Sequence, residues 1–123
     1  MPVPILKQGS ILIACIQPGL SDHQLLLLKD KLSGEVERSR AEGVVIDVSA
    51  IDVMDSFATR TLRSISQTTR LRGARTVVVG IQPDVAFAMI QLGLTMEDVS
   101  TALDLEEAVA MLTAGRVTRR GRD

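Results

Sequence analysis

The chain has 123 residues, a length that suits one domain able to bury its own hydrophobic core without disulfides or metals. Its hydrophobic share of 46%, charged share of 24% and formal net charge of −1 are those of a globular protein, and they exclude the basic, aromatic-rich composition of a nucleic-acid-binding domain. Cys15 is the only cysteine, which excludes intramolecular disulfides and cysteine-based zinc or redox motifs and favours a reducing compartment.

The beginning of the chain predicts a β-hairpin. Ile5–Lys7 and Ser10–Ile16 are apolar segments, and they are joined at Gln8 and Gly9. Glycine can take the positive φ of a tight turn, so the two segments are expected to pair as antiparallel strands. Proline at position 4 suits an edge strand, because proline cannot donate a backbone hydrogen bond.

A helix is predicted next. Ser21 and Gln24 have the spacing of a capping box, and the helix should run to about Ala41, with Gly43 closing it. Apolar residues recur along it at helical spacing: Leu25, Leu28, Leu32 and Val36. The leucines between 25 and 28 cover too wide an arc for one core stripe, so Leu26 or Leu27 should face outward. That outward leucine belongs either to a broad burial face or to a subunit contact.

The middle of the chain has the pattern of a β-α-β unit. Val44–Val48 and Thr76–Val79 are continuous β-branched runs, typical of parallel strands that are covered on both faces. Between them lies a helix that ends near Arg72 and Gly73. Its predicted core face consists of Ala58, Leu62, Ile65 and Thr69. Such a unit takes a right-handed crossover.

The last third predicts a helix, a short strand and a final helix. The first of these helices starts at Pro83 and ends near Leu92, the extended piece is Ser100–Ala102, and the final helix opens at Asp104 and ends near Thr113. Residues 1–114 should therefore form one α/β domain with about five strands and four helices. Residues 115–123 are rich in arginine and have no apolar period, so a disordered basic tail is expected there.

Membrane insertion and export are not indicated by the sequence. No apolar stretch reaches the roughly 18 residues that a membrane-spanning helix needs, and the first residues lack the pattern of a signal peptide. We therefore expect a cytoplasmic protein without membrane contact.

The segment IDVMDSFATRTL contains a serine next to acidic residues, which raises the question whether this serine is a catalytic nucleophile. Asp52, Asp55 and Ser56 stand where a strand gives way to a helix. A nucleophilic serine needs a base and an orienting group, but the GxSxG elbow is absent and the single histidine, His23, lies in the first turn of another predicted helix. The sequence therefore does not indicate a Ser-His-Asp enzyme.

The sequence also lacks the residue patterns that bind nucleotides, phosphoryl groups or metal ions. Neither GxGxxG nor GxxxxGK[ST] occurs, so no loop is built to hold a nucleotide phosphate. A phospho-accepting receiver domain could use Asp47, but Ile16 and Gln17 stand where its acidic pair is expected, and no lysine follows Lys31. No cluster of metal-ligating residues is apparent. We expect no cofactor, no metal and no catalytic residue.

A helical wheel places Ser56 on the solvent side of its helix. With Leu62 directed at the core, four polar residues point away from it: Ser56, Arg60, Arg63 and Gln67. Phe57 also lies off the core direction, and an exposed aromatic ring is a good interface anchor. The sequence leaves two interpretations open: Ser56 is modified on a surface that binds a partner, or Asp55 or Ser56 only caps the helix.

Several quoted segments resemble STAS domains of the anti-sigma factor antagonist family. They are VVIDVSAIDVMDSFATRTL (Val44 to Leu62), RGARTVVVGIQPDVAFAMIQLGL (Arg72 to Leu94), PILK near the start and TALDLEEA near the end. Together they cover about residues 3–114. Within the family the chain is most similar to the RsbS subfamily, the antagonist and scaffold component of the bacterial stressosome.

The resemblance implies a fold, a modified residue and partners. The family has a mixed, mostly parallel sheet of four to five strands, with helices mainly on one side. Ser56 corresponds to a serine that an RsbT-type serine/threonine kinase phosphorylates, and release of the sequestered kinase follows. An RsbR-type STAS paralogue is the expected scaffold partner, in a large hetero-oligomer, and we also expect homodimers. The surface expected to bind partners consists of Asp55, Phe57, Thr59, Arg60 and Arg63.

Two further hypotheses compete with this one. A free dimeric antagonist could bind a kinase or anti-sigma factor without a large assembly, and a STAS module could instead bind nucleotide. Cys15 is expected to be a buried small hydrophobe. Asp47 is expected to cap a loop, the alternative being contact with the kinase.

Overall fold

A computed structural model of the chain describes residues 3–94 and 99–122, with side chains described as far as Ala114. The elements follow the predicted order with small shifts at their ends. They are β1 (Ile5–Gln8), β2 (Ile11–Cys15), α1 (Asp22–Ser39), β3 (Gly43–Asp47), α2 (Ser56–Leu71), β4 (Arg75–Val79), α3 (Pro83–Gln91), β5 (Ser100–Ala102) and α4 (Leu105–Arg122).

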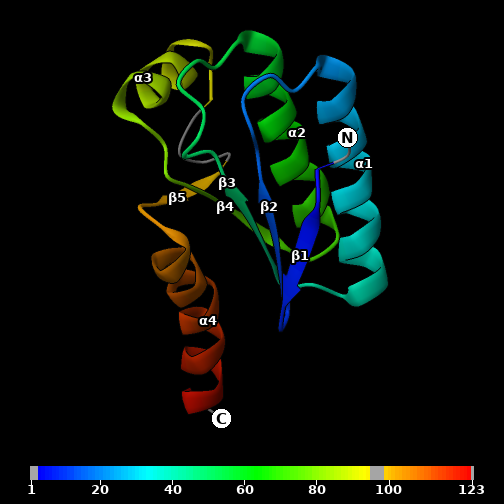
Figure 1. Ribbon diagram of the computed structural model, residues 1–123. Helices are drawn as coiled ribbons and strands as arrows, with labels where there is room; N and C mark the ends of the chain where they lie inside the picture. The colour runs from blue at the N-terminus through cyan, green and yellow to red at the C-terminus, as the bar shows by residue number, and fades with distance from the viewer. Residues whose placement is uncertain (1–2, 95–98, 123) are drawn as a thin grey trace.

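The strands form one five-stranded sheet in the order β1-β2-β3-β4-β5. β1 and β2 are antiparallel, and every later pair is parallel. The hairpin turns at Gly9, which has φ +60°. The helices α1, α2 and α3 therefore all begin at the end of the sheet formed by the C-termini of the parallel strands (Figure 1). This mixed sheet with an N-terminal hairpin confirms the predicted fold class.

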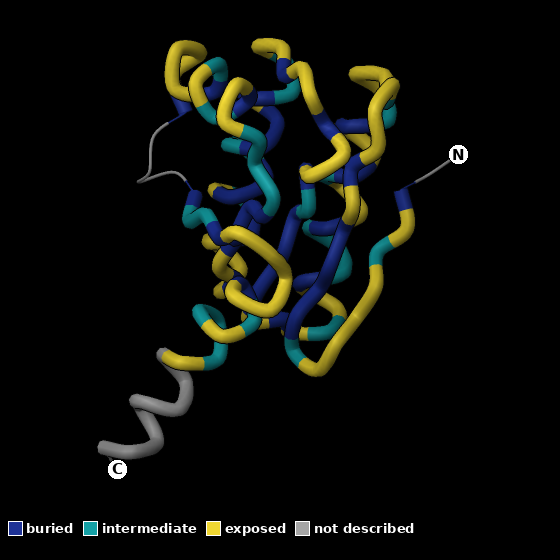
Figure 2. Tube along the Cα trace, turned by 60° about the vertical axis from the view of Figure 1, so that its left-hand side comes forward, coloured by how far each residue is buried: buried dark blue, intermediate teal, exposed yellow. Residues whose placement is uncertain are grey.

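The sheet buries apolar side chains on both faces, but unequally. The larger core lies under α1, α2 and α3, and its strand residues include Leu12, Ala14, Val44, Ile46 and Val78. The smaller core lies on the opposite face beneath α4, and its strand residues are Ile11, Ile13, Val45, Val77, Val79 and Ala102. These residues alternate along each strand, because successive side chains of a strand point to opposite faces. Figure 2 shows the buried residues concentrated along the strands beneath exposed helix surfaces.

The end of α1 differs from the prediction. The helix stops at Ser39, and Arg40 takes the left-handed conformation with φ 53°, so the closing residue is not Gly43. Gly43 is instead the first residue of β3 and is buried. A Cβ atom there would lie 2.7 Å from a methyl group of Leu112. Glycine at position 43 thus lets α4 approach the sheet closely.

The end of α4 also differs from the prediction. The helix was expected to end near Thr113 before a disordered tail, but the backbone stays helical to Arg122. Arginine is among the better helix formers, and positive charge is favourable at a helix C-terminus. A helix of this kind can continue without an apolar stripe. Among the described helices, none combines the length and apolar character needed to cross a membrane.

Candidate functional site

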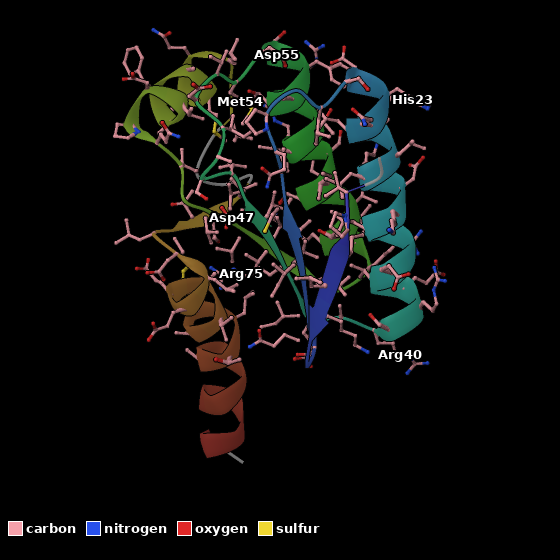
Figure 3. The ribbon with its side chains drawn as sticks, in the orientation of Figure 1. His23, Arg40, Asp47, Met54, Asp55 and Arg75 are labelled. Atoms are coloured by element: carbon pink, nitrogen blue, oxygen red, sulfur yellow. The ribbon has the colours of Figure 1, made fainter. Side chains whose placement is uncertain are left out.

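Ser56 lies at the end of the molecule where the helices begin. Figure 3 shows Asp55 at the start of α2 and His23 at the start of α1 on this side, while Arg40 marks the far end of α1. His23 is exposed, as predicted. The connections from β2 to α1, from β3 to α2 and from β4 to α3 therefore form one surface around the serine.

Asp55, not Ser56, caps α2. The Asp55 Oδ1 atom accepts a hydrogen bond from the Ala58 N–H at 2.7 Å. Ser56 is exposed as the first residue of the helix, and its hydroxyl makes no hydrogen bond within the described part of the chain. Capping by an aspartate satisfies one of the free N–H groups of the first turn. The serine hydroxyl has no corresponding structural role.

The two loops beside the site are held by short polar contacts. Asp47 Oδ1 accepts a hydrogen bond from the Ser49 N–H at 2.8 Å, so Asp47 caps the loop after β3, as expected. The Gln82 side chain donates to the Ser49 carbonyl at 3.1 Å and ties this loop to the start of α3. Gly80, with φ +74°, allows the close approach, since a Cβ there would lie 2.6 Å from the Ser49 Cβ. The backbone leading into α2 thus has a defined path.

Three residues of the predicted binding surface are less exposed than expected. Thr59 is fully buried and donates its hydroxyl to the Asp55 carbonyl at 2.9 Å, so it cannot contact a partner. A threonine can be buried because this internal hydrogen bond satisfies its hydroxyl. Phe57 is only half exposed and packs against the larger core. Arg63 is half buried and donates to the Gly93 carbonyl, which links α2 to the end of α3. Asp55 and Arg60 are exposed, as predicted.

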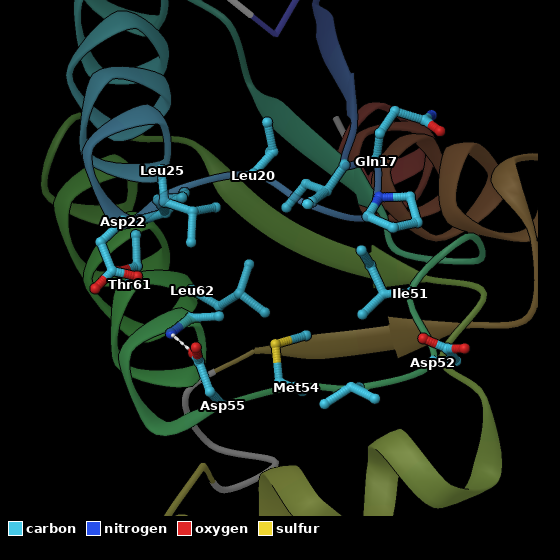
Figure 4. Close-up of a pocket in the computed structure, with 16 residues that line it drawn as sticks. Gln17, Leu20, Asp22, Leu25, Ile51, Asp52, Met54, Asp55, Thr61 and Leu62 are labelled. Atoms are coloured by element: carbon cyan, nitrogen blue, oxygen red, sulfur yellow. Dashed lines mark hydrogen bonds between the residues drawn. The ribbon is translucent and has the colours of Figure 1, made fainter.

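A cleft of about 250 Å³ opens beside the start of α2, between the loop after β2 and the loop before α2. Figure 4 shows its apolar side chains, among them Leu25, Ile51, Met54 and Leu62, with carboxylates around them. These carboxylates belong to Asp22, Asp52 and Asp55, and none of the residues that line the cleft is basic. An anionic ligand such as a nucleotide phosphate is disfavoured there, because like charges repel. The cleft will be called the acidic cleft.

Cys15 was predicted to be buried, but it is exposed. It follows Ile11 and Ile13 on the face of the sheet that α4 covers, and α4 packs mainly on β3, β4 and β5. Partial burial raises the pKa of the Cys15 thiol, and the negative charge of Asp47, its neighbour on β3, raises it further. The thiol is therefore accessible but weakly acidic. The described residues contain no cluster of His, Cys, Asp and Glu that could hold a metal ion.

Comparison with known proteins identifies the fold and its relatives. The family model described as the STAS domain matches residues 3–108. The structure is similar to a variant of RsbS from Moorella thermoacetica, with a TM-score of 0.83 and 34% identity over 95% of this chain and 97% of that one. It is also similar to a chain from a structure of the stressosome, described as a signal integration and transduction hub, with a TM-score of 0.81 and 35% identity over 90% of this chain and 96% of that one.

A sequence relative is longer than this chain. RsbRA of Bacillus subtilis, named an RsbT co-antagonist protein, is 28% identical over 83 residues. The match covers 68% of this chain but only 30% of RsbRA. The similarity to that relative is therefore restricted to one part of it.

Proposed function

The chain belongs to the STAS domain family, and we propose that it is a non-enzymatic subunit of a stressosome, which sequesters an RsbT-type serine kinase and releases it when Ser56 is phosphorylated. The family is regulatory, and the structure resembles RsbS and a stressosome chain over nearly its whole length. An RsbR-type STAS protein is the proposed scaffold partner, supported by the sequence similarity to RsbRA.

The observation that carries the proposal is the exposed hydroxyl of Ser56 directly after the capping Asp55. Because Asp55 satisfies the helix N-terminus, the Ser56 hydroxyl can be modified without loss of the cap. In the kinase reaction a bond forms between Ser56 Oγ and the γ-phosphorus of ATP, the bond from that phosphorus to the oxygen of the leaving ADP breaks, and the hydroxyl proton passes to a base of the kinase. No catalytic group of this chain is required.

The proposal is tested by phosphorylation in solution. The chain is incubated with an RsbT-type kinase and ATP, and the modified residue is located by mass spectrometry of proteolytic peptides. We expect one phosphoryl group on Ser56 and none on the Ser56→Ala variant. Because Thr59 is buried, we expect no phosphoryl group on Thr59 in either form, and fragment ions distinguish it from Ser56 within the peptide. Modification elsewhere, or none, would contradict the proposal.

A further inference from the structure

A second hollow lies next to the acidic cleft, and Thr61 lines both. It has a volume of about 250 Å³ and runs between α1 and α2. Its lining residues are Leu26, Lys29, Phe57, Arg60, Thr61 and Ser64. Its apolar part comes from the half-buried Phe57 ring and from Leu26, whose side chain is 44% exposed. This hollow will be called the α1–α2 groove.

The charge of the α1–α2 groove is positive. Lys29 and Arg60 both line it, and no acidic residue does. Within the described part of the chain neither cation forms an ion pair, whereas Arg38 pairs with Glu35 and Arg72 with Glu37. Two cations without partners beside an apolar surface favour a ligand that brings both carboxylates and an apolar group. The acidic cleft has the opposite preference.

We propose that the α1–α2 groove binds a segment of the kinase in which an apolar side chain stands next to acidic residues. The apolar side chain packs against Phe57 and Leu26, while the carboxylates pair with Lys29 and Arg60. This inference rests on the proposed function and adds to it the chemistry of the partner. It also adds α1 to a surface that the sequence had placed on α2 alone.

The same geometry explains how phosphorylation releases the segment. Ser56 precedes Arg60 by four residues, so their side chains are neighbours on the helix surface. A phosphoryl group on Ser56 adds about −1.5 to −2 charges at neutral pH. It competes with the carboxylates of the segment for the Arg60 guanidinium and repels them. Phosphorylation therefore removes one of the two cations on which binding depends.

The test compares substitutions inside the groove with matched ones outside it. Lys29→Glu and Arg60→Glu reverse the two cations, and Lys31→Glu reverses an exposed lysine of α1 that does not line the groove. Leu26→Ser removes the apolar contact, and Leu27→Ser changes a leucine that is 49% exposed outside the groove. Binding of the purified kinase is measured by calorimetry at two salt concentrations, and each variant is checked by thermal unfolding.

We expect each of the three groove variants to weaken binding about tenfold or more, and the two controls to change it less than about twofold. The wild-type affinity should fall as salt rises, because the ion pairs are exposed to solvent. If all folded variants bind the kinase equally, and the kinase still phosphorylates Ser56 in a separate assay, the inference is overturned and the proposed function stands. Tighter binding after charge reversal would indicate a basic segment and also overturn it. No binding by the wild type, with no phosphorylation of Ser56, would instead count against the proposed function.

Discussion

Asp55 and Ser56 are adjacent in the chain but have different roles at the start of α2. The carboxylate of Asp55 holds the first turn of the helix through the Ala58 N–H, and the Ser56 hydroxyl faces solvent. A phosphoryl group on Ser56 would be attracted by the helix N-terminus and by Arg60 and repelled by the carboxylates of Asp52 and Asp55. The consequence of phosphorylation is therefore expected in the partner's binding more than in the stability of the helix.

Two substitutions at residue 56 separate the effect of a negative charge from the effect of losing the hydroxyl group. Ser56→Asp adds a permanent negative charge, so it should weaken capture of the kinase, while Ser56→Ala should capture the kinase and fail to release it when ATP is added. A pull-down of the kinase with and without ATP measures both effects. The unmodified chain, which should capture the kinase and release it with ATP, is the control. Equal capture by all three forms would contradict a switch at this residue.

The thiol of Cys15 gives a prediction about pH. Its raised pKa means that the thiolate is scarcer at pH 8 than for an ordinary cysteine, so alkylation by iodoacetamide should be slower than that of glutathione. Asp47→Asn removes the repelling charge and should increase the rate, while the amide oxygen can still accept from Ser49. Because the folded state holds this proton more tightly than the unfolded state, the thiol's contribution to stability declines as pH rises through the thiol range. A rate that Asp47→Asn does not change would show that Asp47 has no influence on the thiol.

At the scale of elements, glycines allow loops, helices and strands to approach one another closely. Gly43 lies beneath Leu112 of α4, and Gly80 lies against Ser49 between the loops after β3 and β4. Gly34 differs, because it lies within α1 and the nearest atom to an added Cβ would be the Arg38 guanidinium at 3.6 Å. These positions predict opposite effects of alanine substitution at Gly80 and Gly34 on the free energy of unfolding.

Gly80→Ala should lower the free energy of unfolding by about 1–3 kcal/mol, since a side chain at positive φ is strained and this one would also meet Ser49. Gly34→Ala should raise it by roughly 0.5–1 kcal/mol, because alanine favours the helix and restricts the unfolded chain. Urea unfolding of the two variants measures both changes. A stabilised Gly80→Ala variant would show that the loop after β3 can move away.

Contacts between α1 and α2 hold together the groove that we propose for the kinase. The Arg72 side chain donates to Ser33 Oγ at 3.0 Å and pairs with Glu37 at 2.7 Å, joining the end of α2 to α1. α1 also contributes Leu28, Leu32 and Val36 to the larger core, to which α2 contributes Leu62 and Ile65. Because exposed ion pairs contribute little, apolar packing determines how the two helices lie.

At the scale of the whole molecule, apolar side chains are also exposed on α3 and near the start of α4. Five exposed large side chains lie on α3, just after it and around the start of α4: Phe87, Ile90, Leu92, Leu103 and Leu105. Ile90 and Leu103 line one hollow, and contiguous exposed apolar residues are typical of surfaces that contact other subunits. We therefore expect a subunit contact there.

Co-expression with an RsbR-type STAS protein tests the proposed assembly. We expect a particle of megadalton size in analytical ultracentrifugation, and only small species when the chain is expressed alone. Replacing Phe87 and Leu103 with serine should reduce the large particle if that surface joins subunits, whereas Leu71→Ser, at an exposed leucine of α2, is the control. If only small complexes form with the wild type, the chain acts as a free dimeric antagonist.

The sequence by itself determined the order and type of the elements. It also identified Ser56, the residue on which the proposed function rests. The Ser21 and Gln24 capping box, the hairpin turn at Gly9 and the strand pattern of β3 all depend on residues a few positions apart, so their signals are complete in the sequence. The helical wheel also placed Ser56 and Arg60 at the surface, because the core side of α2 is marked by its apolar residues.

Only the tertiary structure decided which of the remaining side chains are accessible. Thr59 is buried, Cys15 is exposed and Phe57 forms part of a groove with α1, because each of these depends on what a distant element covers. Likewise, the sequence allowed either Asp55 or Ser56 to cap α2, and only the path of the backbone directs the Asp55 carboxylate to the Ala58 N–H. The spacing of residues within one helix marks its core side, but contacts with elements far apart in the chain determine which residues beside that core side are covered.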